Sequence, residues 1–317
     1  MLIRFWGVRG SIPTPPDVLQ IKEQMISLLE FASGKDISDD YKRQILLQEY
    51  INETPLIIGG NTSCVELRSE GKIIIFDMGT GIRNLGRSLL SQPPSENGSP
   101  EYHIFLSHSH WDHIQGFPFF SPAYLPQTKI NFYSVHPDLK KRLELQQDQL
   151  FFPVKLENMP SQMEFIQMEA NCHIELGSLF IENKELYHPG KSYAYSVSSG
   201  NKKMVFATDS EYKDTTPAAA EKYIEFFRNA DLLIFDAQYT FSEGLRKEDW
   251  GHSTSVAGID LAVEAGVKRL ALFHHEPENS DLKLRSMLTQ AHRYKRINYP
   301  DSALEIFLSH EGLEIEI

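Results

Sequence analysis

The densest group of metal-binding residue types in the chain is the run Ser107–His113, with the sequence SHSHWDH. The run follows Tyr102–Leu106, which has the hydrophobic composition of a buried strand. In an extended segment, side chains two positions apart face the same side, so His108 and His110 can direct their imidazoles to one point. The aspartate and histidine that end the run follow where the chain turns and can face a neighbouring point. Imidazole nitrogens with a carboxylate suit zinc or a similar metal, so the run predicts a metal site.

Three further residues that can bind a metal each follow a strand-like stretch: His188, Asp209 and His274. Taken alone, a histidine or aspartate at a strand end is more often a turn former or a solvated group. Sites in layered α/β folds nevertheless draw their ligands from separate strand ends, so these residues are candidates as a set. His275 stands beside His274, and the residues alone do not decide which of the two faces the site.

The composition restricts the class of protein and of partner. The 317 residues include 31 Lys and Arg against 43 Asp and Glu, a net charge of −12, which disfavours a large nucleic acid as partner. Cys64 and Cys172 form no disulfide framework and suit a reducing cytoplasm. No apolar run is long enough for a membrane span, and the first residues lack the apolar core of a secretory signal. We therefore expect a cytoplasmic globular protein.

The elements that must position these residues alternate between strands and helices, which predicts a layered α/β domain. Apolar residues recur at helical spacing from Asp17 to Ala32, and a second helix is predicted at Asp40–Ile51. Strand patterns resume only at Cys64, so residues 17–51 are predicted to be a helical insertion within a single domain of residues 1–317. The insertion can be a packing or dimer element, or a lid over a site.

Further elements are predicted from hydrophobic periodicity. Strands are expected at Leu2–Trp6, Cys64–Arg68, Lys72–Phe76, Tyr102–Leu106, Ile130–Val135, Ser178–Glu182, Ala194–Val197, Lys203–Ala207, Leu232–Phe235, Leu270–Phe273 and Ala303–Leu308. Helices are expected at Pro137–Leu150, Ala218–Asn229, Ser253–Ala265 and Asp281–Ala291.

The order of the candidate residues resembles the five motifs of the metallo-β-lactamase superfamily. The matching positions are Asp77, His108, His110, Asp112, His113, His188, Asp209 and His274. Trp6–Thr14 (WGVRGSIPT) and Gly59–Cys64 (GGNTSC) look like the branch that contains ribonuclease Z and small cyclic-phosphate phosphodiesterases. Gly251–Thr254 (GHST), whose histidine precedes His274 by 22 residues, is similar to the histidine motif of ribonuclease Z.

This resemblance implies a four-layer αββα sandwich, a homodimer and a site for two divalent metal ions. The metal implied is zinc, with manganese or iron as alternatives. His108, His110 and His188 would hold the first ion; Asp112, His113 and His274 would hold the second, and Asp209 would bridge them. The family pattern favours His274 over His275. Asp77 is expected to orient a ligand imidazole rather than to bind a metal.

The chemistry implied is hydrolysis of a phosphodiester by attack of a metal-bridging hydroxide on phosphorus. Asp112 would orient the hydroxide, and His252 would give a proton to the departing alkoxide. Ser253 and Thr254, at the start of a predicted helix, are candidates to bind a phosphate oxygen. Arg9 and Asn61 are either further phosphate contacts or ordinary turn residues.

The predicted substrate is a small cyclic nucleotide or cyclic phosphate. Ribonuclease Z carries a long arm for tRNA between the positions of His188 and Asp209, but here only 21 residues separate them. Phe117, Phe119, Phe120 and Tyr124 either form a wall for a base or, as we favour, pack in the core. The alternatives are an RNA 3′-processing endonuclease like ribonuclease Z, and a lactonase or thioesterase that uses the same metals.

Overall fold

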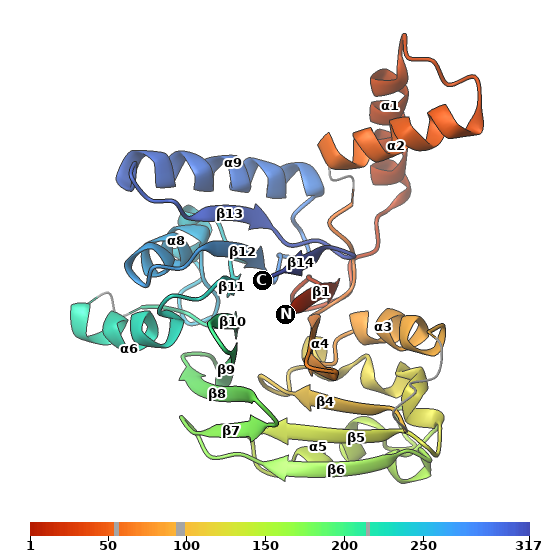
Figure 1. The fold of residues 1–317 in the computed structure, drawn as a ribbon, viewed down its shortest axis with the longest axis vertical. Coiled ribbons are helices and arrows are strands. Elements are labelled where there is room, and N and C mark those ends of the chain that lie inside the picture. Colours follow the sequence, from red (N-terminus) through yellow and green to blue (C-terminus); the bar gives the residue numbers. More distant parts are fainter. Residues whose placement is uncertain (54–56, 93–98, 214–215) are drawn as a thin grey trace.

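The computed structural model describes residues 1–53, 57–92, 99–213 and 216–317. Two seven-stranded sheets form the centre of the molecule, and helices lie along their outer sides (Figure 1). The four-layer α/β sandwich expected from the sequence is therefore confirmed.

The first sheet has the strand order β14-β1-β2-β3-β4-β5-β6. Its strands are β1 Leu2–Gly7, β2 Cys64–Ser69, β3 Lys72–Phe76, β4 Glu101–Phe105, β5 Lys129–Ser134, β6 Gln162–Gln167 and β14 Glu314–Glu316. Strands β3 to β6 run parallel, with Ile75 opposite Ile104 and Ile104 opposite Phe132. Their carboxyl ends therefore meet at one edge of the sheet.

The second sheet has the order β13-β12-β11-β10-β9-β8-β7. Its strands are β7 His173–Leu176, β8 Leu179–Leu186, β9 Ser192–Ser199, β10 Lys202–Ala207, β11 Leu232–Asp236, β12 Arg269–Phe273 and β13 Glu305–Leu308. Strands β10 to β13 are parallel, and β11 is buried along its whole length. A parallel strand covered on both faces needs apolar side chains on both, which explains the run Leu-Leu-Ile-Phe in β11.

The α-helices are α1 Val18–Ala32, α2 Asp40–Glu53, α3 Gly81–Leu90, α4 Trp111–Ile114, α5 Leu139–Gln146, α6 Pro217–Phe227, α7 Phe241–Gly244, α8 Ser255–Glu264 and α9 Asp281–Asn298. Helix α3 buries Ile82 and Leu85 in a core that it shares with the outer face of the first sheet. Helices α8 and α9 contribute Ile259 and Met287 to the larger core of the second sheet. None of the helices among the described residues is long and apolar enough to cross a membrane.

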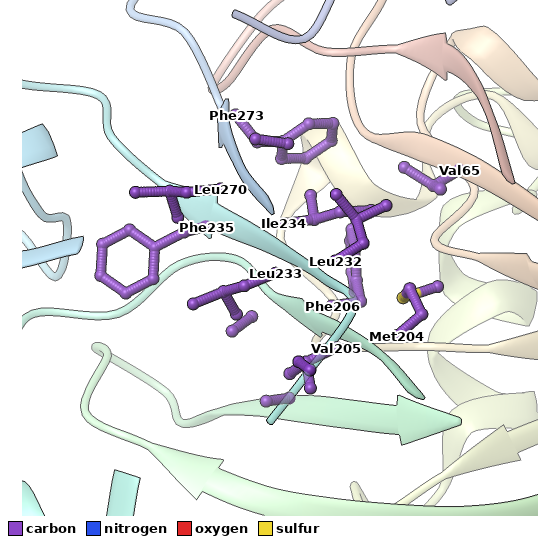
Figure 2. Close-up of a cluster of buried hydrophobic side chains, with 14 of the residues drawn as sticks. Val65, Met204, Val205, Phe206, Leu232, Leu233, Ile234, Phe235, Leu270 and Phe273 are labelled. Carbon is purple, nitrogen blue, oxygen red and sulfur yellow. The ribbon is translucent and has the colours of Figure 1, made fainter. Parts of the chain in front are cut away.

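Aromatic and aliphatic side chains from both sheets fill the space between them. Phe206 of β10 stacks on Phe76 of β3, with ring centroids 5.2 Å apart. Figure 2 shows side chains of β10, β11 and β12 in this core together with Val65 of β2. This shared core fixes the two sheets against each other and thereby places their strand ends.

Helices α1 and α2 form a hairpin that projects away from the two sheets (Figure 1). Asp17 begins α1 with a capping box in which Asp17 and Gln20 bond each other's backbone. Phe31 packs on Tyr50 at 5.1 Å, but α1 has no buried residue. The two predicted helices are thus present, while the interpretation of residues 17–51 as an insertion in one domain stays a prediction.

Candidate metal centre

The candidate residues lie where parallel strands end. Asp77 follows β3 and the run Ser107–His113 follows β4; Asp209 follows β10 and His274 follows β12. The carboxyl ends of parallel strands meet at one edge of a sheet, and in a sandwich the two edges come together. Side chains far apart in the sequence therefore converge on one place.

His108, His110 and His188 form the first ligand set. Each offers a ring nitrogen, and these atoms lie within 4.8 Å of one another. His188 Nε2 is 3.1 Å from His110 Nδ1. His188 Nδ1 donates to the carbonyl oxygen of Gly251 at 2.8 Å, which leaves its Nε2 facing the set. Three imidazoles directed to one point are a common arrangement for a zinc ion.

Asp112, His113, Asp209 and His274 form the second ligand set, again with ligand atoms within 4.8 Å of one another. Asp112 Oδ2 is 3.2 Å from the Nε2 atoms of both His113 and His274. All four residues are buried. The set therefore contains two carboxylates and two imidazoles that are shielded from solvent.

Asp209 lies between the two sets. Its Oδ1 is 3.2 Å from Nε2 of His113 and of His274. Its Oδ2 is 3.7 Å from Nε2 of His108 and 3.8 Å from Nε2 of His188. One oxygen thus faces each set, which is the geometry that a bridging carboxylate requires.

Three of these strand-end residues adopt the left-handed backbone region. Asp77, Asp209 and His274 have φ angles of 61°, 55° and 60°. Non-glycine residues adopt this region rarely, although Asp and His do so more readily than most. The sharp turn after each strand directs the side chain back towards the sheet edge, and such backbone strain is concentrated at functional sites.

The donor atoms fit divalent metal ions. The Nε2 atoms of His108 and His113 are buried without a hydrogen-bond partner among the described residues. Burial holds the pKa of His108 well below its ordinary value. Burial alone would raise the pKa of Asp209, but His113, His274 and His108 outweigh it and hold that pKa well below its usual range. Burial lowers the pKa of His113 and His274, but the neighbouring carboxylates outweigh it and raise the first well above its ordinary value and the second to about 9. A metal ion at these nitrogens would displace the protons, because ligands bind as neutral imidazoles and ionised carboxylates.

Asp77 holds one of the ligands in place. His113 Nδ1 donates to Asp77 Oδ2 at 2.7 Å, so its Nε2 is left to face the second set. The same carboxylate accepts hydrogen bonds from the backbone nitrogen and the hydroxyl of Ser107, at 2.8 and 2.9 Å. This carboxylate–imidazole contact supports the orienting role expected for Asp77, which stays a prediction.

The structure also distinguishes His274 from its neighbour. His274 lies in the second set, whereas His275 donates through Nε2 to the carbonyl oxygen of Ser309 at 2.9 Å. Burial, with Arg9 nearby, lowers the pKa of His275 to about 3. His275 is thus a neutral, buried histidine that faces away from the cluster.

His252 stands beside both sets and forms a pair with an aspartate that the sequence did not reveal. His252 Nδ1 lies 2.8 Å from Oδ2 of Asp236, the last residue of β11. The ring centroid of His252 is 5.2 Å from that of His188 and 5.0 Å from that of His274. The only indication of Asp236 in the sequence is its place at the end of an apolar strand, as for Asp209.

The loop after β1 supplies a second contact that no side-chain pattern indicates. The backbone nitrogen of Ser11 donates to Asp112 Oδ2 at 2.7 Å. A Cβ on Gly10 would lie 2.5 Å from Cε1 of His274, so only glycine lets the loop pass this close to the ring. The loop therefore holds two members of the second set.

Arg9 and Asn61 are not phosphate contacts. Arg9 is buried and donates to the carbonyl oxygens of Gly59 and Asn279 at 2.9 and 2.8 Å. Asn61 donates to Glu311 at 2.8 Å. Both side chains use their donors to fix the loops behind the site.

The other candidate contacts have mixed outcomes. Thr254 accepts a hydrogen bond from the backbone nitrogen of Ala257 and so caps α8, and Ser253 is buried next to it. Their role in phosphate binding stays a prediction. Phe117 and Phe120 are buried in the core beside α3, which confirms core packing over a base wall for these two rings.

The chain is similar to a known protein family and to known enzymes. The model of the Beta-lactamase superfamily domain matches residues 72–275. A ribonuclease Z of Picrophilus torridus is 25% identical over 304 residues, which cover 82% of this chain and 91% of the relative.

Two solved structures share the fold over the whole chain. Human tRNase Z, short form, has a TM-score of 0.60 at 17% identity, covering 100% of this chain and 99% of that one. A diphosphatase from the PhnP family has a TM-score of 0.59 at 17% identity, covering 100% of this chain and 97% of that one. At this identity the likeness concerns the fold alone.

The matched residues 72–275 include every member of both ligand sets as well as Asp77, Asp236 and His252. The family likeness and the geometry of the site thus fall on the same part of the molecule, and the chain belongs to the beta-lactamase superfamily domain family.

Proposed function

We propose that this protein is a metal-dependent phosphodiesterase whose substrate is a small cyclic nucleotide or cyclic phosphate. One observation carries the proposal: two adjoining ligand sets share Asp209, and His252 is held beside them by Asp236. Two divalent ions, zinc by donor type with manganese or iron as alternatives, would supply Lewis acidity towards phosphate oxygens and hydroxide at neutral pH.

The residues of the chain divide the remaining tasks. Asp112 accepts a hydrogen bond from the Ser11 amide, which holds its carboxylate where it can orient the attacking water. His252 donates through Nδ1 to Asp236, which fixes its tautomer and leaves Nε2 to pass a proton to the departing alkoxide. To act as this acid, His252 must be in its protonated form.

Two features support a small substrate. The 21 residues from His188 to Asp209 are occupied by β9 and β10, which leaves no segment for a protruding arm. The net charge of −12 also disfavours a long polyanion.

The second candidate function is 3′-processing of RNA, as the name ribonuclease Z of the Picrophilus relative suggests. A lactonase or thioesterase would also release an alkoxide or a thiolate that His252, beside His188 and His274, could protonate, so the lactone in the panel below tests this reading. A cytoplasmic location and a homodimer stay predictions, based on the cysteine content and on the family resemblance.

The test is hydrolysis of a substrate panel, with metal content measured on the same purified sample. The panel holds bis-p-nitrophenyl phosphate, 3′,5′-cyclic nucleotides, a precursor tRNA and a simple lactone. We expect cleavage of the cyclic nucleotides and of bis-p-nitrophenyl phosphate without tRNA processing, at about two ions per chain. Processing of the precursor tRNA would establish the second candidate, and lactone turnover alone would overturn both.

A further inference from the structure

A cavity of about 580 Å³ opens beside His252. It is lined by residues 211–213, which follow Asp209, by α6, α7 and α8, and by Tyr299 after α9. Its volume lies within the range of about 300–1,000 Å³ typical of small-ligand sites. His252 belongs both to this wall and to a group of possible ligand atoms with His188 and Asp209. The cavity therefore adjoins the candidate metal centre at His252.

Aromatic rings form much of the wall. Tyr212 stacks on Phe235 at 5.1 Å and meets Tyr223 edge-on at 4.8 Å, and Phe241 is 60% exposed at the mouth. The ring of Tyr212 is thus covered by its neighbours, whereas the exposed ring of Phe241 is free to stack on a nucleobase.

The charged groups of the wall are mostly carboxylates. Glu211, Glu248, Asp260 and Glu264 line the cavity, with Lys213 as the one basic side chain among its described lining residues apart from His252. Lys213 lies 3.7 Å from Glu211 and 3.8 Å from Glu248, so its charge is already matched. Asp260 accepts from the hydroxyls of Tyr294 and Tyr299, each at 2.9 Å. The wall thus offers many acceptors and a negative potential, which repels a further phosphate and attracts N–H donors.

We propose that this cavity binds the base of a 3′,5′-cyclic nucleotide and selects guanine. Guanine presents an N–H and an amino group side by side, which a carboxylate accepts together. Adenine and uracil offer fewer N–H donors on that edge, and hypoxanthine lacks only the amino group. The inference rests on the proposed function, because a base in the cavity places the phosphate at the metal centre.

The test compares kcat/KM of the metal-loaded enzyme on cyclic GMP and cyclic IMP, which differ only in the 2-amino group. Cyclic AMP, cyclic UMP and base-free bis-p-nitrophenyl phosphate complete the set. We expect cyclic GMP to exceed cyclic IMP by about tenfold or more, since a hydrogen-bonded base edge discriminates by at least that factor. The difference is expected in KM rather than in kcat, because the base is remote from the reacting phosphorus.

Two variants test whether the cavity is responsible for the preference for guanine. The double variant Glu248→Gln with Glu264→Gln removes two exposed carboxylates of the wall and should bring the ratio of cyclic GMP to cyclic IMP close to one. The matched control is Glu169→Gln, an exposed carboxylate outside the cavity, which should keep the ratio of the parent enzyme.

Different outcomes test guanine selection and the phosphodiesterase proposal separately. Turnover of bis-p-nitrophenyl phosphate with equal kcat/KM for cyclic GMP and cyclic IMP overturns guanine selection and leaves the phosphodiesterase proposal standing. A ratio that survives in the double variant also overturns the assignment to this cavity. No turnover of any phosphodiester by a protein that holds its metal ions overturns the proposed function, and the inference with it.

Discussion

Asp209 divides its two carboxylate oxygens between the ligand sets. Oδ1 faces His113 and His274 at 3.2 Å, and Oδ2 faces His108 at 3.7 Å and His188 at 3.8 Å. Removing it takes a ligand from both sets at once and leaves buried imidazoles without an anionic partner. Ions held at the two sets would therefore be coupled through one side chain.

We expect Asp209→Ala to lose both metal ions and all measurable turnover. Metal content is measured by inductively coupled plasma mass spectrometry, against about two ions per chain in the parent. Glu169→Gln, outside both sets, serves as the matched control and should retain its metal. Retention of one or two ions by folded Asp209→Ala would contradict the bridging position.

Replacing His252 is expected to affect turnover but not metal content, because His252 stands outside both proposed ligand sets and is held by Asp236. His252→Ala should keep the metal content and lower kcat by about 10²–10⁴-fold, the usual contribution of a general acid. Asp236→Asn should lower kcat less, since the imidazole keeps a hydrogen-bond partner. An unchanged kcat would remove His252 from the mechanism, and loss of metal would make it a ligand instead.

Local sequence patterns indicated a site only where several metal-binding residue types stand close together in the chain. His108, His110, Asp112 and His113 are dense in the sequence and follow a clear strand, so their convergence could be expected. Asp236 could not, because an acid after an apolar strand is an ordinary feature. The Ser11 amide could not either, since every residue except proline carries a backbone N–H.

The loop after β1 acts as an element of the site through its backbone. Gly10 lies against the ring of His274, where a Cβ would be 2.5 Å from Cε1. Gly10→Ala must therefore displace the ring or the loop. We expect a lower affinity for an ion at the second ligand set. Metal titration of protein stripped of its metal with a chelator measures this affinity.

The control for this loop is Gly200→Ala, at the turn between β9 and β10. Gly200 has a φ of 57°, and a Cβ there would meet nothing within 4 Å. This variant should lose about 1–2 kcal/mol of unfolding free energy from backbone strain and keep its metal affinity. Equal metal affinity in both variants would show that the close approach of Gly10 does not position His274.

The α1–α2 hairpin is expected to serve assembly rather than the metal centre. Val18, Leu19, Met25 and Leu29 are 62–80% exposed on α1, an apolar surface that a monomer seldom presents. Replacing residues 17–51 by a short Gly-Ser linker should convert a dimer to a monomer with metal content unchanged. Light scattering after gel filtration measures the mass, and an unchanged mass would place any dimer contact elsewhere.

The positions of strands were predicted most accurately where nearly all of their residues are apolar. The strands β3, β4, β10, β11 and β12 were expected within a residue or two, because both faces are covered. Strands β6 and β7 were missed, since these edge strands alternate exposed and half-buried residues. The helix expected at Pro137–Leu150 is only Leu139–Gln146, because Asp148 turns the chain by accepting from the backbone nitrogen of Leu150.

At the scale of the whole molecule, each ligand set takes residues from both sheets. His108 and His110 follow a strand of the first sheet and His188 a strand of the second, and the other set is divided in the same way. Ions bound at these sets would link the sheets in addition to the core between them. Ligands bound only to the native state stabilise it in proportion to the logarithm of their concentration over Kd.

Chelation should therefore lower the melting temperature by about 5 °C or more, measured by calorimetry with and without a strong chelator. Restoring the ions should restore the original value. Asp209→Ala, which cannot hold them, should melt at one temperature under both conditions. If the chelator does not change the melting temperature of the parent protein, then the ions do not join the sheets.

The division of each ligand set between the sheets also governs when the centre can arise during synthesis. The first half of the chain leaves the ribosome with His108, His110, Asp112 and His113, yet it completes neither set. His188 must follow for one set, and Asp209 and His274 for the other. A nascent or truncated chain therefore carries no finished hydrolytic centre, and activity begins only when the second sheet has docked on the first.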